Sequence, residues 1–143
     1  MKLQCSSFLC GDASREDRVR ALLDRNTQTG AYGLRLTPQQ AQALVAAQTE
    51  ALDHAGRLEF GGGVLDRMAC AFCTSPYFGP KDWEHALRTL TELFYWFKNE
   101  TRDRAGDKEL LDWMRAAFDG PCHGSLELLA GLDPRELLEK GNG

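Results

Sequence analysis

The run Leu93-Phe94-Tyr95-Trp96-Phe97 constrains the fold of this chain more than any other feature of its sequence. It lies in a segment from about Lys81 to Thr101 whose apolar residues recur at helical spacing. At the run this stripe widens to almost all faces, so neighbouring elements must cover the segment on several sides. We therefore predict that it forms the central helix of a mainly α-helical domain.

Six other segments carry helical spacing or helix-start signals, and the 143 residues fit one domain. The clearest start is Thr37-Pro38-Gln39-Gln40, a capping box with proline at the first helical position, and Gly56 is placed to end that helix. About seven helices are expected, with no second domain and a poorly ordered segment at 1–11. The expected helices besides the central one are 14–26, 38–55, 64–74, 107–119 capped by Asp107, a short helix near 125, and 133–141. Alternation of apolar and polar residues at 32–36 and 57–60 leaves a small two-stranded β-ribbon open.

Charge and hydropathy exclude several classes of protein. The chain has 17 basic and 21 acidic residues, a net charge of −4, so no cationic field favours nucleic acid or an anionic membrane as partner. Its longest apolar run is far below the roughly 20 residues of a membrane span, and no signal segment is visible at the start. We expect a cytoplasmic protein.

The spacing of the cysteines is compatible with a metal or redox site, but their placement in the predicted helices argues against one. Cys70 and Cys73 have the two-residue gap of such a pair, and Cys122 with His123 would complete four ligands. Both thiols of the pair are predicted in mid-helix, off the apolar stripe, whereas redox pairs use helix N-termini. The five cysteines are therefore interpreted as reduced, and no metal or cofactor is expected.

Gly61-Gly62-Gly63 offers backbone amides before a helix start, which is a plausible cradle for a small anion. The amides of Gly62, Gly63 and Val64 would hold the anion, with Lys98 as a nearby cation. The alternative is steric, because three glycines allow a sharp turn and a close approach to another helix. No nucleotide-binding pattern follows the glycines.

Lys98-Asn99-Glu100 places hydrogen-bonding groups beside the aromatic run, as the lining of a pocket would. Glu59 and Glu100 are candidates for a carboxylate pair in acid–base chemistry. The alternative is that a helix simply leaves the core at this point. Ser125 is a further candidate for binding, although its position favours a helix cap.

Three segments resemble a bacterial family of proteins of unknown function. They are Glu59-Phe60-Gly61-Gly62-Gly63, residues 94–100 and residues 122–127. The resemblance covers roughly 29–132. It implies a compact cytoplasmic bacterial protein and supplies no catalytic roles.

We interpret the chain as a protein-interaction or small-ligand-binding module, with a protein partner or self-association expected. The reason is a surplus of aromatic residues, more than one central helix can hide: Phe78, Trp83, Tyr95, Trp96 and Trp113. The alternative is a small enzyme with a polar pocket near Glu59, Lys98, Asn99 and Glu100. The two differ because an enzyme needs polar groups that converge in a cavity, whereas an interaction module needs an exposed apolar patch.

Overall fold

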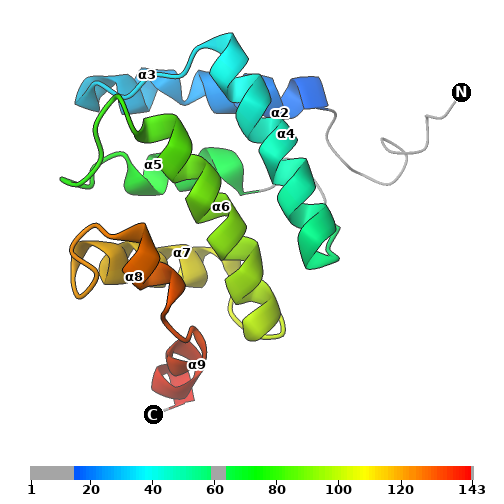
Figure 1. The fold of residues 1–143 in the computed structure, drawn as a ribbon, viewed down its shortest axis with the longest axis vertical. Coiled ribbons are helices and arrows are strands. Elements are labelled where there is room, and N and C mark those ends of the chain that lie inside the picture. The colour runs from blue at the N-terminus through cyan, green and yellow to red at the C-terminus, as the bar shows by residue number, and fades with distance from the viewer. Residues whose placement is uncertain (1–14, 59–63, 143) are drawn as a thin grey trace, which may run out of the picture.

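Helix α6 (Trp83–Glu100) lies at the centre of the domain. The computed structural model describes residues 15–58 and 64–142. Four helices pack against α6 and cover most of its surface (Figure 1): α4 (Pro38–Ala55), α5 (Leu65–Phe72), α7 (Asp107–Asp119) and α8 (Leu126–Ala130). The expected central helix is therefore confirmed.

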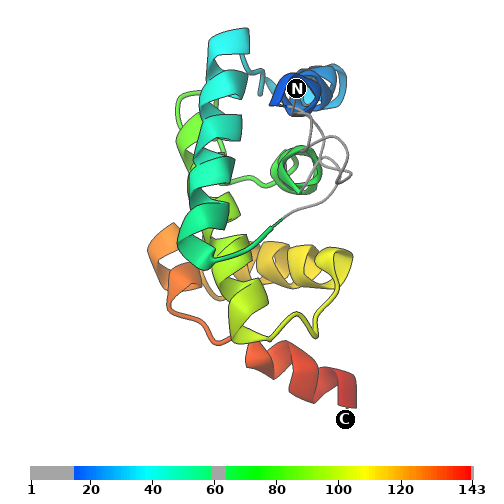
Figure 2. The same ribbon diagram turned by 90° about the vertical axis from the view of Figure 1, so that its right-hand side faces the viewer.

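The remaining elements lie at the two ends of the domain. Helix α2 (Arg15–Asp24) packs on α4 and α5, and it is followed by the single turn α3 (Asn26–Thr29) and the 3-10 turn η1 (Gly30–Tyr32). Helix α9 (Arg135–Asn142) lies at the opposite end (Figure 2). All seven expected helices are present, and α3 is an additional helical turn, within the described residues, that the periodicity did not predict. Across 15–58 and 64–142, no helix is both long and apolar enough to cross a membrane.

The predicted capping box of α4 is present in full. The Gln40 backbone N–H donates to Thr37 Oγ1 at 3.1 Å, and the Thr37 N–H donates to Gln40 Oε1 at 2.9 Å. At the other end, Gly56 adopts the left-handed conformation, with φ 68°, that the sequence predicts. The box and the glycine fix both ends of α4, which in turn fixes the helix face that meets α6.

The β-ribbon is not formed in the part of the chain that the structure describes, which has no strand and excludes 59–60. Leu34 and Leu36 are buried as the alternation requires, but their backbone is irregular. The backbone of Leu36 hydrogen-bonds to a side chain instead of to a second strand. The Asn26 side-chain amide donates to the Leu36 carbonyl and accepts from the Leu36 N–H, each at 2.9 Å. One amide side chain thus replaces the second strand.

The aromatic run on α6 is covered on every side except one. Phe94, Tyr95 and Phe97 are at most 1% exposed, whereas the Trp96 side chain is 56% exposed. Of the other expected surplus aromatics, Trp83 is buried and Trp113 packs edge-on against Phe97 at 5.4 Å between ring centroids. The number of aromatic residues that the core cannot bury was therefore overestimated. Of those predicted, Trp96 is the one that is largely exposed.

We predict that Phe94→Ala and Trp96→Ala differ sharply in their effect on folding. Loss of the buried Phe94 ring should lower the free energy of unfolding by about 3–5 kcal/mol, through lost burial and the cavity left behind. Loss of Trp96 should cost less than about 1 kcal/mol, because its ring is largely in water. Urea denaturation of both variants tests this, and equal losses would contradict the described burial.

Candidate functional site

Two of the predicted site residues, Lys98 and Asn99, take part in one polar cluster at the C-terminal end of α6. Lys98 is 8% exposed, and its Nζ donates to the Ala105 carbonyl at 2.9 Å. The same nitrogen lies 2.9 Å from Asp107 Oδ1 and 3.9 Å from Asp103 Oδ1. Its ammonium group is therefore surrounded by acceptors of the 101–107 loop and the start of α7. The members of the polar cluster are Arg57, Arg67, Lys98, Asn99, Asp103 and Asp107.

Arg57 links the end of α4 to this cluster. Its guanidinium donates to Asn99 Oδ1 at 2.8 Å and to both oxygens of Asp103 at 2.6 and 3.1 Å. Asn99 in turn donates from Nδ2 to the Ala55 carbonyl at 2.9 Å, which satisfies a backbone group of the last turn of α4. The cluster therefore fastens the C-terminal ends of α4 and α6 together.

The charges of the cluster lower the pKa values of its two carboxyl groups. The hydrogen bond from Arg57 lowers the pKa of Asp103, and it outweighs the opposing effect of burial. Burial opposes ionisation of Asp107, but hydrogen bonds and charges from Lys98 and Arg67 outweigh it and lower its pKa. Asp103 and the preceding Arg102 are both left-handed, with φ 60° and 54°. Side chains rarely adopt this conformation, so the turn is strained where its carboxylate meets Arg57.

Of the other predicted site residues, the two that the structure describes, Glu100 and Ser125, are not in this cluster. Glu100 is exposed, and Ser125 caps α8 by accepting from the Leu128 N–H at 3.1 Å. Glu59 and Gly61-Gly62-Gly63 lie outside the described residues, so their convergence with Lys98 stays a prediction. The sequence was wrong that Asp107 caps α7. Gly106 precedes that helix, and the Asp107 carboxylate is drawn to Lys98 instead.

The position of Cys73 also differs from the prediction made from the sequence. Cys73 was predicted in mid-helix and off the apolar stripe, but it is the C-cap of α5, which ends at Phe72, and it is only 6% exposed. Its backbone is still helical, and its thiol donates to the Cys70 carbonyl at 3.3 Å. Cys70 is partly exposed, and its thiol donates to Gln28 Oε1 at 3.0 Å. Burial raises the pKa of both thiols, which opposes a nucleophilic role. Among the described residues, no group of three or more His, Cys, Asp or Glu is placed to hold a metal.

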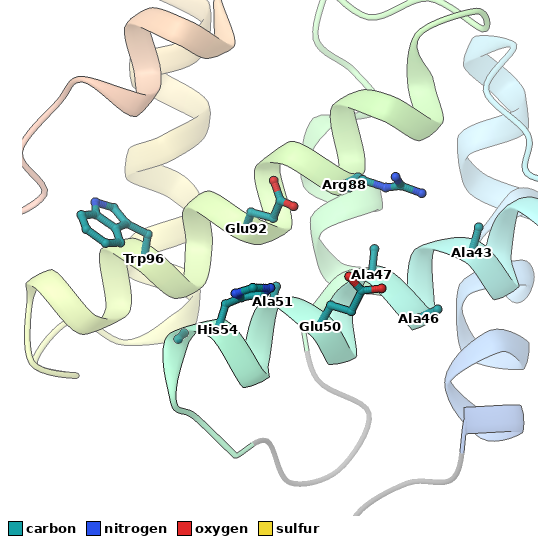
Figure 3. A pocket seen from close by; sticks show the side chains of 10 residues that line it. Ala43, Ala46, Ala47, Glu50, Ala51, His54, Arg88, Glu92 and Trp96 are labelled. Atoms are coloured by element: carbon teal, nitrogen blue, oxygen red, sulfur yellow. The ribbon is translucent and has the colours of Figure 1, made fainter.

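An open groove between α4 and α6 is the candidate site that the structure adds (Figure 3). Its volume is about 610 Å³. Alanines of α4 form its floor, at positions 43, 46, 47, 51 and 55. Because alanine carries a single methyl group, this row leaves space beside α6 that longer side chains would fill.

Charged and aromatic side chains form the rim of the groove. Glu50 and His54 project from α4, and Arg88, Glu92 and Trp96 project from α6 (Figure 3). The three α6 residues are spaced by four, so they lie on one helix face. Four of these side chains are polar: Glu50, His54, Arg88 and Glu92. Within the described part of the chain, none of them makes a side-chain hydrogen bond or an ion pair.

The groove lies between α4 and α6, which run side by side in the same direction, as Figures 1 and 2 show. Gln48 Nε2 donates to the Tyr95 hydroxyl at 3.2 Å within the core, and Asn99 meets Ala55 further along both helices. No polar or ligating motif in the sequence points to the groove, because its floor consists of alanine side chains. The one available signal was the repeat of alanine at 43, 47, 51 and 55, every fourth residue.

A family model described as a family of unknown function, DUF6323, matches residues 21–140. The chain belongs to this family. No curated protein and no solved structure matches the chain. The DUF6323 region contains α4 to α8, and with them the whole groove and the whole polar cluster.

The polar cluster predicts how stability depends on pH. Because the folded-state pKa values of Asp103 and Asp107 lie below the ordinary 3.8, their contribution is present above pH 3.8 and is lost as pH falls through the lowered values. Asp103→Asn should therefore lower the melting temperature at neutral pH, by an amount that shrinks in acid. Asp112→Asn is the control, since its pair with Lys108 is exposed. A loss that persists at low pH would show that Asp103 acts by another route.

We also predict that a chelator leaves the thermal melt unchanged and that elemental analysis finds no stoichiometric zinc or iron. A structural zinc contributes on the order of 10 kcal/mol to folding, so its removal would unfold the domain. One metal per chain, lost together with the fold on chelation, would contradict this expectation.

Proposed function

We propose that this chain is a protein-association module and that the α4–α6 groove is its docking surface. The observation that carries the proposal is Trp96, a large ring that is 56% exposed beside an apolar floor. Folding does not require a tryptophan at a position that faces water. Tryptophan and arginine are enriched among the residues that dominate binding energy at protein interfaces, and the groove has one of each.

The shape of the groove favours a protein over a small molecule. Small-molecule sites usually bury most of the ligand in an enclosed cleft. Here the rim residues are exposed, and the groove is open above a floor of small side chains that extends over 43–55 of α4. An apolar centre with a charged rim is the usual composition of a protein interface, and a helix laid in a groove is a common mode of recognition.

The alternative of a small enzyme built on Lys98 and Asn99 is less well supported. The hydrogen-bonding groups of both side chains are already bound to Ala55, Arg57, Ala105 and Asp107. A catalytic acid or base needs access to its substrate. In the described residues these two side chains serve the packing of loops and helix ends.

A photoreactive benzophenone amino acid in place of His54, on the groove rim, tests the proposal. The full chain would be irradiated in the cells in which it occurs, with the same group in place of Lys108 as control. Lys108 is exposed on α7, which contributes nothing to the groove. We expect a discrete adduct with a protein chain from position 54 and none from position 108.

The mass of the adduct separates the alternatives. A gain below the mass of a protein chain would identify a small-molecule ligand and contradict the proposal. Absence of any adduct from position 54, or the same adducts from both positions, would contradict it as well. Circular dichroism of both labelled chains checks that each is folded.

A further inference from the structure

We propose that the occupant of the groove is a second copy of this chain, so that two grooves face each other across a two-fold axis. This inference rests on the proposed function. In a two-fold interface the same surface meets itself, so it must carry both members of each complementary pair. The α4–α6 groove does so for shape and for charge.

The shape pair is Trp96 and the alanine floor. Trp96 projects from α6 at one end of the groove, whereas Ala47 and Ala51 on α4 form part of the low floor (Figure 3). When two such surfaces face each other, each tryptophan has an apolar depression opposite it. Burial of the two rings would remove from water the largest apolar groups on this face.

The charge pair is Arg88 against the carboxylates Glu50 and Glu92. Arg88 has no ion-pair partner within the described residues of its own chain, and neither has either glutamate. Across a two-fold axis, Arg88 of each copy faces the acidic part of the other rim. The two contacts are formed twice, once from each side.

The size of the face fits a weak dimer. Each helix has 18 residues, which gives a length of about 27 Å, and packed helix axes lie about 8–10 Å apart. Because each helix is itself about 10 Å across, two helices side by side present a face about 18–20 Å wide. The footprint is then about 500 Å² per copy, or roughly 1,000 Å² in total, which is the size of weak interfaces. We expect an equilibrium between monomer and dimer that depends on concentration.

Sedimentation equilibrium of the unmodified chain over a wide concentration range is the first test. The mass should rise from that of one chain to that of two. Trp96→Ala should weaken the dimer about tenfold or more, because tryptophan is among the residues that dominate binding energy at protein interfaces. Leu128→Ala is the matched control, since Leu128 is 55% exposed on α8, outside the groove. It should leave the dimer unchanged.

Charge reversal tests the pairing itself. Arg88→Glu makes the whole rim acidic, and Glu50→Arg with Glu92→Arg makes it basic, so each protein alone should remain a monomer. Mixed together, the two should form a heterodimer, and Trp96→Ala in both chains should weaken it as it weakens the unmodified dimer. A dimer that survives either reversal alone would overturn the proposed pairing.

The outcomes separate this inference from the proposed function. If the chain is monomeric at every concentration and position 54 crosslinks to a different protein, the second copy is wrong and the docking surface stands. If the chain is monomeric and position 54 gives no protein adduct, both fail. An adduct of twice the chain mass supports both.

Discussion

The burial of α6 is the constraint on which the rest of the structure depends. Its aromatic run presents apolar surface on nearly every side, and α4, α5, α7 and α8 each cover part of it. Among these helices, α4 makes the most extensive packing with α6. A buried Gln48–Tyr95 hydrogen bond and the Arg57–Asn99 contact fix how far one helix is shifted along the other. Since the floor of the groove belongs to α4 and three of its five rim side chains belong to α6, this shift also determines which rim side chains stand next to one another.

Sequence reasoning succeeded where the cause is local. The capping box at Thr37, the left-handed Gly56 and the periodic apolar stripes depend on residues within a few positions, and the helices they predict are present. It failed where a distant side chain takes over a local role. Asn26 supplies the partner that a strand would give Leu36, and Lys98 draws Asp107 away from a capping position. Neither pairing can be derived from spacing along the chain.

The candidate site shows the same division between local and distant causes. Lys98 and Asn99 were correctly expected near the end of a helix beside a buried surface, but the partners that occupy them lie in the 101–107 loop and on α4. The groove could not be predicted because it is made by what alanine lacks. A methyl group on a helix is compatible with burial or with an open floor, and only the neighbouring helix decides which. Trp96 was predicted as one of several surplus aromatic residues. Nothing in the neighbouring sequence indicates that Trp96 is exposed whereas Tyr95 is buried.

The parallel arrangement of α4 and α6 has a consequence for how the chain reaches its native state. Adjacent helices in simple bundles are often antiparallel and joined by short loops, so most of their contacts are local. Here the contacts that join α4 to α6 close loops of 44 to 47 residues: Asn99–Ala55, Arg57–Asp103 and Gln48–Tyr95. Closure of long loops costs entropy before any contact compensates it, and a high share of such contacts slows folding. We therefore expect the helix pair that forms the groove to assemble after the local turns and caps, and its alanine row and aromatic run to stay exposed until that step is complete.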